Sequence, residues 1–354
     1  MTLPHRRDFL KHSAAMLAVG ASPSLSANAS SQGSKGTPQE FAAYQKKRRK
    51  ELWNLLGELP WDHKPGPAKL VKTEKHDGYT LERLVLDLNG LEPVPAILLI
   101  PDKRSRSAGR APGLLFIHWH GGMYDLGKEQ LLIGDKAQPA YAPVCAEKGL
   151  VTLAIDSWCF GERKHQADGH TGEEDAFKLM LWRGQVLYGM MMFDEFRALD
   201  YLASRPEADA ARLGAFGMSM GSTKAWWLAA LDPRVRLCLD VCCLTDFEEL
   251  IRIHNLKGHG IYYYLPSLLK HFSTAQINEL IVPRPRLSVN GRQDDLTPPA
   301  GVERVRDYLL PLYRKYGKEE DCRIKLFDCP HVELPEMRKL ILEWMDKYLV
   351  KTAW

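Results

Sequence analysis

The feature that most constrains the fold is a regular alternation of short apolar runs with helical patterns after about residue 80. The runs are bounded by Pro, Gly or polar residues, as strands are. They cover residues 81–88, 94–100, 113–117, 150–155, 213–217, 235–241, 286–290 and 323–327. Helical spacing occurs at 40–56, 193–204, 223–231, 302–316 and 335–349. This alternation predicts an α/β fold with a mostly parallel central sheet flanked by helices.

Two stretches between these elements, residues 158–192 and 246–285, are too long for simple connections. We expect them to be insertions at the sheet edge, where lids and substrate walls are usually built. The second contains the aromatic run Ile261-Tyr262-Tyr263-Tyr264-Leu265. The run either packs an inserted helix into the core or lines a pocket, and Tyr262 is therefore a candidate substrate-binding residue.

The N-terminus has the layout of an export signal. Arg6-Arg7 precede Phe9, Leu10 and Lys11, and a weakly apolar segment and the small residues around Ala29 follow. A charged start, a short apolar run and an A-x-A site predict a secretory signal peptide. The paired arginines make it resemble a Tat signal, which a receptor reads. We expect residues 1–29 to be this signal, 30–80 a linker and N-terminal extension, and 81–354 the catalytic domain.

Charge and cysteine content exclude several other classes of protein. The chain of 354 residues has 48 basic and 44 acidic side chains, a net charge of +4. The signal holds three basic residues against one acidic, so the mature chain keeps only +2, which argues against a nucleic-acid partner. No apolar run reaches the roughly 18–20 residues of a membrane span, so no membrane association is expected after signal removal. The seven cysteines include no CxxC pair and are expected to be buried free thiols.

A candidate nucleophile follows the strand predicted at 213–217. Gly217-Met218-Ser219-Met220-Gly221 matches G-x-S-x-G, and a helical pattern begins at about residue 223. Strand, tight turn and helix are the context that this motif requires, because the turn exposes the serine hydroxyl. Ser219 is the predicted nucleophile, and the N–H of Met220 is a predicted oxyanion donor.

A serine nucleophile needs a base and an acid that orients the base, and in this fold the acid precedes the histidine. Asp294 follows the strand at 286–290 in a G-x-x-D-x-x-x-P pattern and is the preferred acid. Asp295 is the fallback and Asp246 a weaker candidate. His331 follows the last strand, and it is the only histidine after Asp294 in the sequence. We therefore predict His331 as the general base.

The second oxyanion donor is expected in the loop after the strand at 113–117. The sequence there is His118-Trp119-His120-Gly121-Gly122. It aligns with an H-G-x-G-G pattern in which Trp119 replaces the first glycine. The predicted donor is the backbone N–H of His120, and Trp119 is a candidate substrate-binding residue.

Together these segments resemble the α/β-hydrolase superfamily, and more closely its acetyl xylan esterase and dienelactone hydrolase-like branch. The likeness spans about residues 80–350 and includes Asp156 and Gly161-Glu162-Arg163. It implies a serine esterase with no metal or organic cofactor. A dienelactone hydrolase proper would have a cysteine nucleophile where this chain has Ser219. Arg163 is a candidate for holding a polar or anionic substrate group; structural pairing with Asp156 or Glu162 is the alternative.

The predicted function is a periplasmic or secreted serine carboxylesterase, exported by the Tat machinery. Its expected substrates are short-chain, acetyl-like esters of carbohydrates or other plant-derived alcohols. A prolyl-oligopeptidase-like peptidase is the main alternative, although about 50 residues before position 81 cannot form the usual propeller. A metal hydrolase using His118 and His120, with His254 or His259, and a non-catalytic binding protein are the other two.

Overall fold

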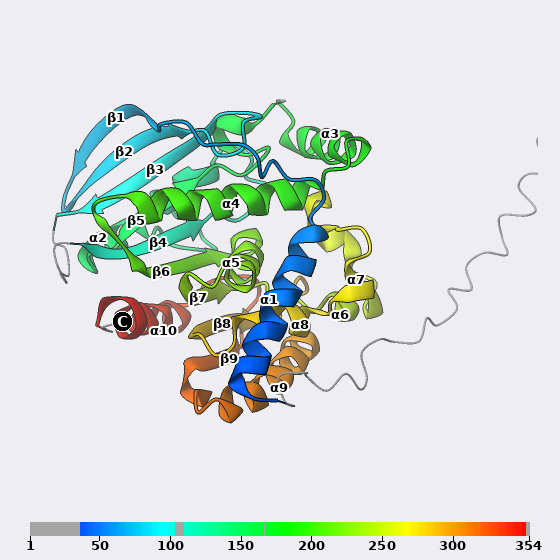
Figure 1. Ribbon diagram of the computed structural model, residues 1–354. Coiled ribbons are helices and arrows are strands. Elements are labelled where there is room, and N and C mark those ends of the chain that lie inside the picture. Colours follow the sequence, from blue (N-terminus) through cyan, green and yellow to red (C-terminus); the bar gives the residue numbers. More distant parts are fainter. Residues whose placement is uncertain (1–35, 103–109, 166, 352–354) are drawn as a thin grey trace, which may run out of the picture. The chain divides into compact units, whose positions relative to one another are not determined.

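The computed structural model describes residues 36–102, 110–165 and 167–351. The predicted signal peptide lies outside these ranges. Within them, nine strands form one sheet (Figure 1). They are β1 Lys69–His76, β2 Tyr79–Leu86, β3 Val94–Pro101, β4 Ala111–Ile117, β5 Val151–Ile155, β6 Ala208–Met218, β7 Val235–Val241, β8 Arg286–Gly291 and β9 Cys322–Phe327. All eight strands predicted from the apolar runs are therefore confirmed.

The sheet has the order β1-β2-β3-β5-β4-β6-β7-β8-β9. The five pairs from β5 through β4 to β9 are parallel, and the three pairs that involve β1, β2 and β3 are antiparallel. The predicted α/β fold with a mostly parallel sheet is confirmed. Because β5 and β6 flank β4 on opposite sides, the strand order reverses at β4. Sites in such sheets form at the carboxyl ends of the strands beside this reversal.

Strand β1 was not expected, because its sequence lacks an apolar face. Lys69-Leu-Val-Lys-Thr-Glu-Lys-His is mostly exposed and pairs only with β2. Lysine-rich edge strands are a common protection against pairing with other chains. The same polarity that protects the edge removes the alternating pattern by which a strand is recognised.

Helices cover both faces of the sheet. They are α1 Pro38–Asn54, α2 Ala142–Glu147, α3 Gly169–Trp182, α4 Leu187–Ser204, α5 Met220–Leu231, α6 Phe247–Arg252, α7 Leu268–His271, α8 Thr274–Asn278, α9 Pro299–Lys315 and α10 Pro335–Met345. Side chains of α1, α4, α5 and α9 form one apolar core with one face, and those of α2 and α10 form the other core. Figure 1 shows α4 crossing the sheet. Alternate strand residues supply the two cores, as the two-residue period of a strand requires.

The segment before the first predicted strand is part of the same compact unit. Helix α1 begins with a capping box between Thr37 and Glu40. The buried side chain of Gln45 donates to the backbone carbonyls of Glu279 and Val282, at 3.0 and 2.7 Å. Residues 36–80 therefore contribute a helix, an edge strand and core contacts.

The two long insertions become short helices near the carboxyl edge of the sheet. The first carries the 3₁₀ turn η3 (Gly161–Arg163) and α3, and the second carries α6, the turn η5 (Ile261–Tyr263), α7 and α8. All seven cysteines lie in the described ranges, are buried and form no disulfide there. No helix in these ranges is long and apolar enough to span a bilayer.

Candidate active site

Ser219 lies on the turn that joins β6 to α5. Its φ and ψ are 55° and −119°, a strained conformation for a residue with a side chain. Its N–H donates to the carbonyl of Val241 at 2.9 Å, which fixes the turn against β7. A Cβ on Gly217 would lie 2.4 Å from the carbonyl carbon of Gly221, and one on Gly221 would lie 2.0 Å from Ile117 O. Both glycines are required by this close approach, and the serine side chain stays partly exposed.

His331 and Asp294 form a hydrogen-bonded pair on neighbouring strand ends. His331 Nδ1 lies 2.7 Å from Asp294 Oδ2, and Asp294 is only 2% exposed. Asp294 Oδ1 accepts the N–H of Leu296 at 3.0 Å, which orients the carboxylate. Because Nδ1 donates to a carboxylate, Nε2 of the neutral ring is the unprotonated nitrogen. This Nε2 is buried and has no partner within the described residues.

The other two candidate acids are placed elsewhere. Asp295 is exposed on the same loop. Asp246 caps α6 by accepting the N–H groups of Glu248 and Glu249, and its other oxygen pairs with Arg304 at 2.9 Å. Of the three, Asp294 is the carboxylate that contacts the histidine.

Residue Cys242 shows that the serine turn and the His331–Asp294 pair are close together. It directly follows Val241, the residue that accepts the N–H of Ser219. Its thiol and one ligand atom each of Asp294 and His331 lie within 4.8 Å of one another. The three residues predicted from chain order therefore lie at the carboxyl ends of β6, β8 and β9.

The predicted oxyanion donors come from two adjacent strand ends. Met220 is the first residue of α5, where backbone N–H groups have no acceptor within the helix. After β4, the N–H of Trp119 donates to Gln130 Oε1 at 2.8 Å. The N–H of His120 finds no acceptor in the described part of the chain. Of these two consecutive amides, only that of His120 is therefore available to a ligand.

The imidazole of His120 connects this loop to both insertions. Its Nδ1 accepts the N–H of Gly122 at 3.1 Å, and its Nε2 donates to Glu173 of α3 at 3.1 Å. The hydroxyl of Tyr124 donates to the same carboxylate oxygen at 2.7 Å. A Cβ on Gly260, in the second insertion, would lie 3.0 Å from His120 Nε2. Both insertions therefore reach the loop that follows β4.

Arg163 is placed where it cannot hold a substrate, and that prediction is wrong. Its side chain is 1% exposed and pairs with Glu92 at 2.6 Å and Asp194 at 2.9 Å. The alternative partners were also misassigned, because Asp156 and Glu162 pair with Lys128 instead. The one contact between Arg163 and Asp156 is a hydrogen bond from the guanidinium to the backbone carbonyl of Asp156.

The two aromatic candidates are also buried. Trp119 is 3% exposed and belongs to the core between the sheet, α2 and α10. Tyr262 is 3% exposed and stacks on the ring of His120, with centroids 5.6 Å apart. Tyr262 therefore supports the loop after β4, and neither ring presents a free face to a substrate.

The histidines proposed for a metal hydrolase do not converge. His118 is fully buried, with Nδ1 donating to Trp119 O at 2.9 Å and Nε2 accepting the N–H of Ser157 at 3.1 Å. Burial holds the pKa of its imidazole well below the usual range, so the ring is neutral. The one group of three potential ligands in the described ranges, Cys242 with Asp294 and His331, contains none of these histidines.

A large cavity lies beside α3. It has a volume of about 800 Å³ and is lined by Glu92, Trp158, His165 and residues of α3, including Gly172 and Trp182. Trp182 is 88% exposed. Gly172 lines the cavity and the next residue, Glu173, contacts His120, so α3 borders both the cavity and the loop after β4.

The comparisons with known proteins agree with this geometry. A model of the Abhydrolase family (Abhydrolase_7) matches residues 28–297, about three quarters of the chain. The chain belongs to the Abhydrolase family. A Bacillus subtilis (strain 168) protein named "Putative hydrolase YtaP" is 41% identical over 304 residues, which are 85% of this chain and 99% of that protein.

Among solved structures, this member of the Abhydrolase family is similar to acetyl xylan esterase 1 from Thermoanaerobacterium sp. JW/SL YS485. The TM-score is 0.57 and the identity 18%, over 88% of this chain and 94% of that one. A glucuronoyl esterase from Solibacter usitatus matches with a TM-score of 0.62 and 15% identity, over 86% and 92% of the two chains. At these identities the likeness shows the α/β-hydrolase fold.

Two residues beside the site were missed by the sequence reasoning, and a third was given another role. Glu173 and Gly260 lie in the insertions, and no spacing in the sequence connects them to His120. His259 stacks on Tyr263, with centroids 4.3 Å apart, and donates from Nε2 to Leu296 O at 3.0 Å. From the sequence, it was predicted only as a candidate metal ligand.

Proposed function

We propose that the protein is a serine carboxylesterase with Ser219, His331 and Asp294 as its catalytic triad. The observation that carries the proposal is the His331–Asp294 hydrogen bond with a free Nε2, next to a strained serine turn. A serine is inert at its own pKa, and this arrangement supplies the base that it needs.

The proposed reaction follows from these positions. Ser219 Oγ attacks the ester carbonyl carbon while His331 Nε2 takes the hydroxyl proton. Asp294 holds the ring and stabilises the imidazolium that forms. The N–H groups of Met220 and His120 bind the oxyanion. The tetrahedral intermediate then expels the alcohol, which receives the proton from His331. Water attacks the acyl-enzyme in the same way and releases the acid.

For the substrate, we propose short acyl groups on a carbohydrate. The 800 Å³ cavity beside α3 combines the exposed indole of Trp182 with charged side chains such as Glu92 and Lys178. Aromatic faces and polar side chains together suit a sugar, which has both apolar and hydroxyl surfaces. The names of the structural neighbours, acetyl xylan and glucuronoyl esterases, favour the same class.

We further propose export through the Tat pathway, on the evidence of the paired Arg6-Arg7. Fusing residues 1–35 to a folded reporter tests it. The reporter is expected outside the cytoplasm, and Arg6→Lys/Arg7→Lys is expected to retain it inside.

The triad is tested by Ser219→Ala with a matched control, Ser222→Ala. Ser222 lies one turn away on α5, and its buried hydroxyl has no partner in the described residues. We expect Ser219→Ala to lower kcat/KM for p-nitrophenyl acetate at least about 1,000-fold, and Ser222→Ala to stay near wild type.

The same assay decides between substrate classes. We compare turnover of acetyl, feruloyl and methyl esters, a lactone and a prolyl peptide. Each substrate is assayed with a chelator and with a serine-directed fluorophosphonate. Acetyl esters are expected to turn over fastest and fluorophosphonate to abolish turnover. Full activity of Ser219→Ala would contradict the mechanism, and a maximum at octanoyl esters or longer would contradict the short-acyl assignment.

A further inference from the structure

Two hydrogen bonds hold the carbonyl of the peptide group between Trp119 and His120, and a third holds the preceding N–H. Gln130 Nε2 donates to Trp119 O at 3.2 Å, while Gln130 Oε1 accepts the N–H of Trp119 at 2.8 Å. His118 Nδ1 donates to the same carbonyl oxygen at 2.9 Å. Two donors thus bind one carbonyl, and the Gln130 amide is fully engaged by a single residue of the loop.

This carbonyl belongs to the same peptide unit as the His120 N–H. A trans peptide is planar, so its C=O and N–H point in opposite directions. Fixing the carbonyl oxygen of Trp119 therefore fixes the direction of the His120 N–H. Two donors on the oxygen also polarise the unit, which strengthens its N–H as a donor by about 10–30% for each bond in a chain.

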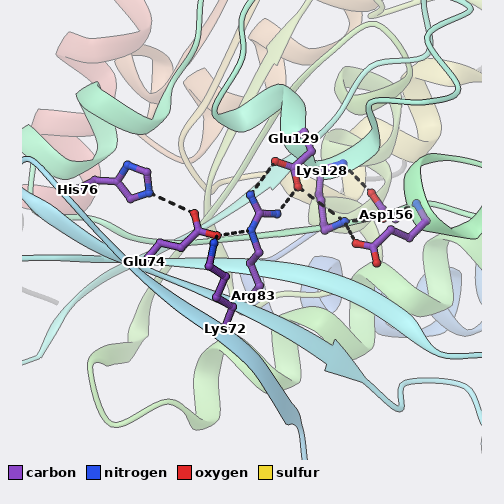
Figure 2. A network of polar contacts seen from close by, with 8 residues as sticks. Lys72, Glu74, His76, Arg83, Lys128, Glu129 and Asp156 are labelled. Carbon is purple, nitrogen blue, oxygen red and sulfur yellow. Dashed lines mark hydrogen bonds and ion pairs between the residues drawn. The ribbon is translucent and has the colours of Figure 1, made fainter.

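The turn that carries Gln130 is anchored by ion pairs of the two residues before it, Lys128 and Glu129. Gln130 lies on the 3₁₀ turn η2 (Gly127–Leu131) and is fully buried. Lys128 pairs with Asp156 at the end of β5 at 2.8 Å. Glu129 pairs with Arg83 of β2 at 2.6 Å. Figure 2 shows that these ion pairs run from strands β1 and β2 across η2 to Asp156.

We propose that Gln130 is a positioning residue for acyl transfer, which aims the His120 N–H at the oxyanion. The inference rests on the proposed function, since it assigns His120 as a donor to the tetrahedral intermediate. Gln130 does not touch the substrate and acts only through the peptide of Trp119. The ion pairs of Lys128 and Glu129 keep η2 in place under the loop.

The test compares Gln130→Met and Gln130→Glu with the control Gln45→Met. Gln45 is also a buried glutamine with two hydrogen bonds to backbone, but it lies on α1. Gln130→Met removes both bonds to Trp119, whereas Gln130→Glu keeps only the acceptor. We expect kcat for p-nitrophenyl acetate to fall about 10- to 100-fold in Gln130→Met, with KM changed less than about threefold. Gln130→Glu is expected to lie between this variant and wild type.

A transition-state analogue separates positioning from loss of folding. A trifluoromethyl ketone forms a tetrahedral adduct with a nucleophilic serine and places an oxyanion in the same position. Its affinity is expected to fall in parallel with kcat/KM across the two Gln130 variants. Gln45→Met is expected to lower the melting temperature while kcat and ketone affinity stay near wild type.

The outcomes distinguish the two proposals. If the wild-type protein hydrolyses no ester and is not labelled by fluorophosphonate, the proposed function fails, and the inference about Gln130 fails with it. If the wild type is active and Gln130→Met keeps its kcat and ketone affinity, only the positioning role is overturned. A loss of kcat that matches the loss in Gln45→Met at equal destabilisation would also overturn it.

Discussion

Two histidines separated by one residue serve different purposes in the loop after β4. His118 is fully buried and neutral, and each of its ring nitrogens has a backbone partner. His120 is at the edge of the site, where its imidazole bonds to Glu173 and its N–H is free. The H-x-H spacing resembles a metal-ligand pair, but burial decides which atoms are available.

His259 provides a prediction for the dependence of stability on pH. Burial lowers the pKa of its imidazole from 6.5 to about 4, and the nearby His331 and His120 act in the same direction. Between pH 4 and 6.5 the unfolded chain binds more protons at this residue than the folded chain. Stability must therefore fall as the pH falls through this interval.

We expect His259→Asn to reduce this acid-induced loss by on the order of 2 kcal/mol, measured by urea unfolding at pH 7 and pH 4. His118 keeps its own contribution in the variant. His170→Asn, at an exposed residue, is the control and should leave the loss unchanged. An identical pH dependence in His259→Asn and wild type would refute the assignment.

At the scale of elements, α3 is the clearest case of one helix with two functions. Its buried Glu173 bonds to His120, whereas Leu179, Leu181 and Trp182 near its C-terminus are exposed. An indole that is 88% exposed contributes almost nothing to folding by burial. Its position on the rim of the cavity is better explained by contact with a ligand.

We therefore predict that Trp182→Ala weakens the use of an acetylated polysaccharide more than that of a small ester. The expected loss of kcat/KM is up to about tenfold for the polymer and less than about twofold for p-nitrophenyl acetate, because a stacked ring contributes about 0.5–1.5 kcal/mol. Ile133→Ala, at an exposed residue outside the cavity lining, is the control. Equal losses on both substrates would rule out a role in polymer binding.

At the scale of the whole molecule, buried charges connect helices that lie far apart in sequence. Lys224 of α5 is fully buried and pairs with Glu195 of α4 at 2.8 Å, and it also bonds to Ser157 after β5. Burial lowers the pKa of Lys224 and raises that of Glu195. The attraction and the hydrogen bond between the two groups oppose both shifts.

Lys224→Met is expected to cost about 3–5 kcal/mol of unfolding free energy, because it leaves the Glu195 carboxylate buried without a cation. The double variant Lys224→Met/Glu195→Met is expected to recover a large part of this loss. Urea unfolding of the wild type, both single variants and the double variant forms the required cycle. Additive losses in the double variant would show that the two groups are not coupled.

Local patterns in the sequence were sufficient for strands β2 to β9, for helices α1, α4, α5, α9 and α10, and for the order of the candidate triad, but not for α2, α3 or the short helices of the second insertion. A buried strand requires an apolar run, and the G-x-S-x-G turn requires glycines at 217 and 221 because backbone atoms approach them closely. Such requirements involve residues that are close in sequence, so they can be recognised from the sequence alone. Edge strand β1 has no apolar face, and it was therefore not predicted.

Only the tertiary structure decided which side chains meet across the sheet. The partners of Arg163 are 71 and 31 residues away in the chain, as Glu92 and Asp194, and no local pattern selects them over Asp156 or Glu162. The same holds for Glu173 at His120 and for Gln130 at Trp119. The sequence alone determined which chemistry the chain carries and in what order. The packing of the insertions and of η2 determined the surroundings of that chemistry, because those contacts depend on three-dimensional distance rather than on spacing.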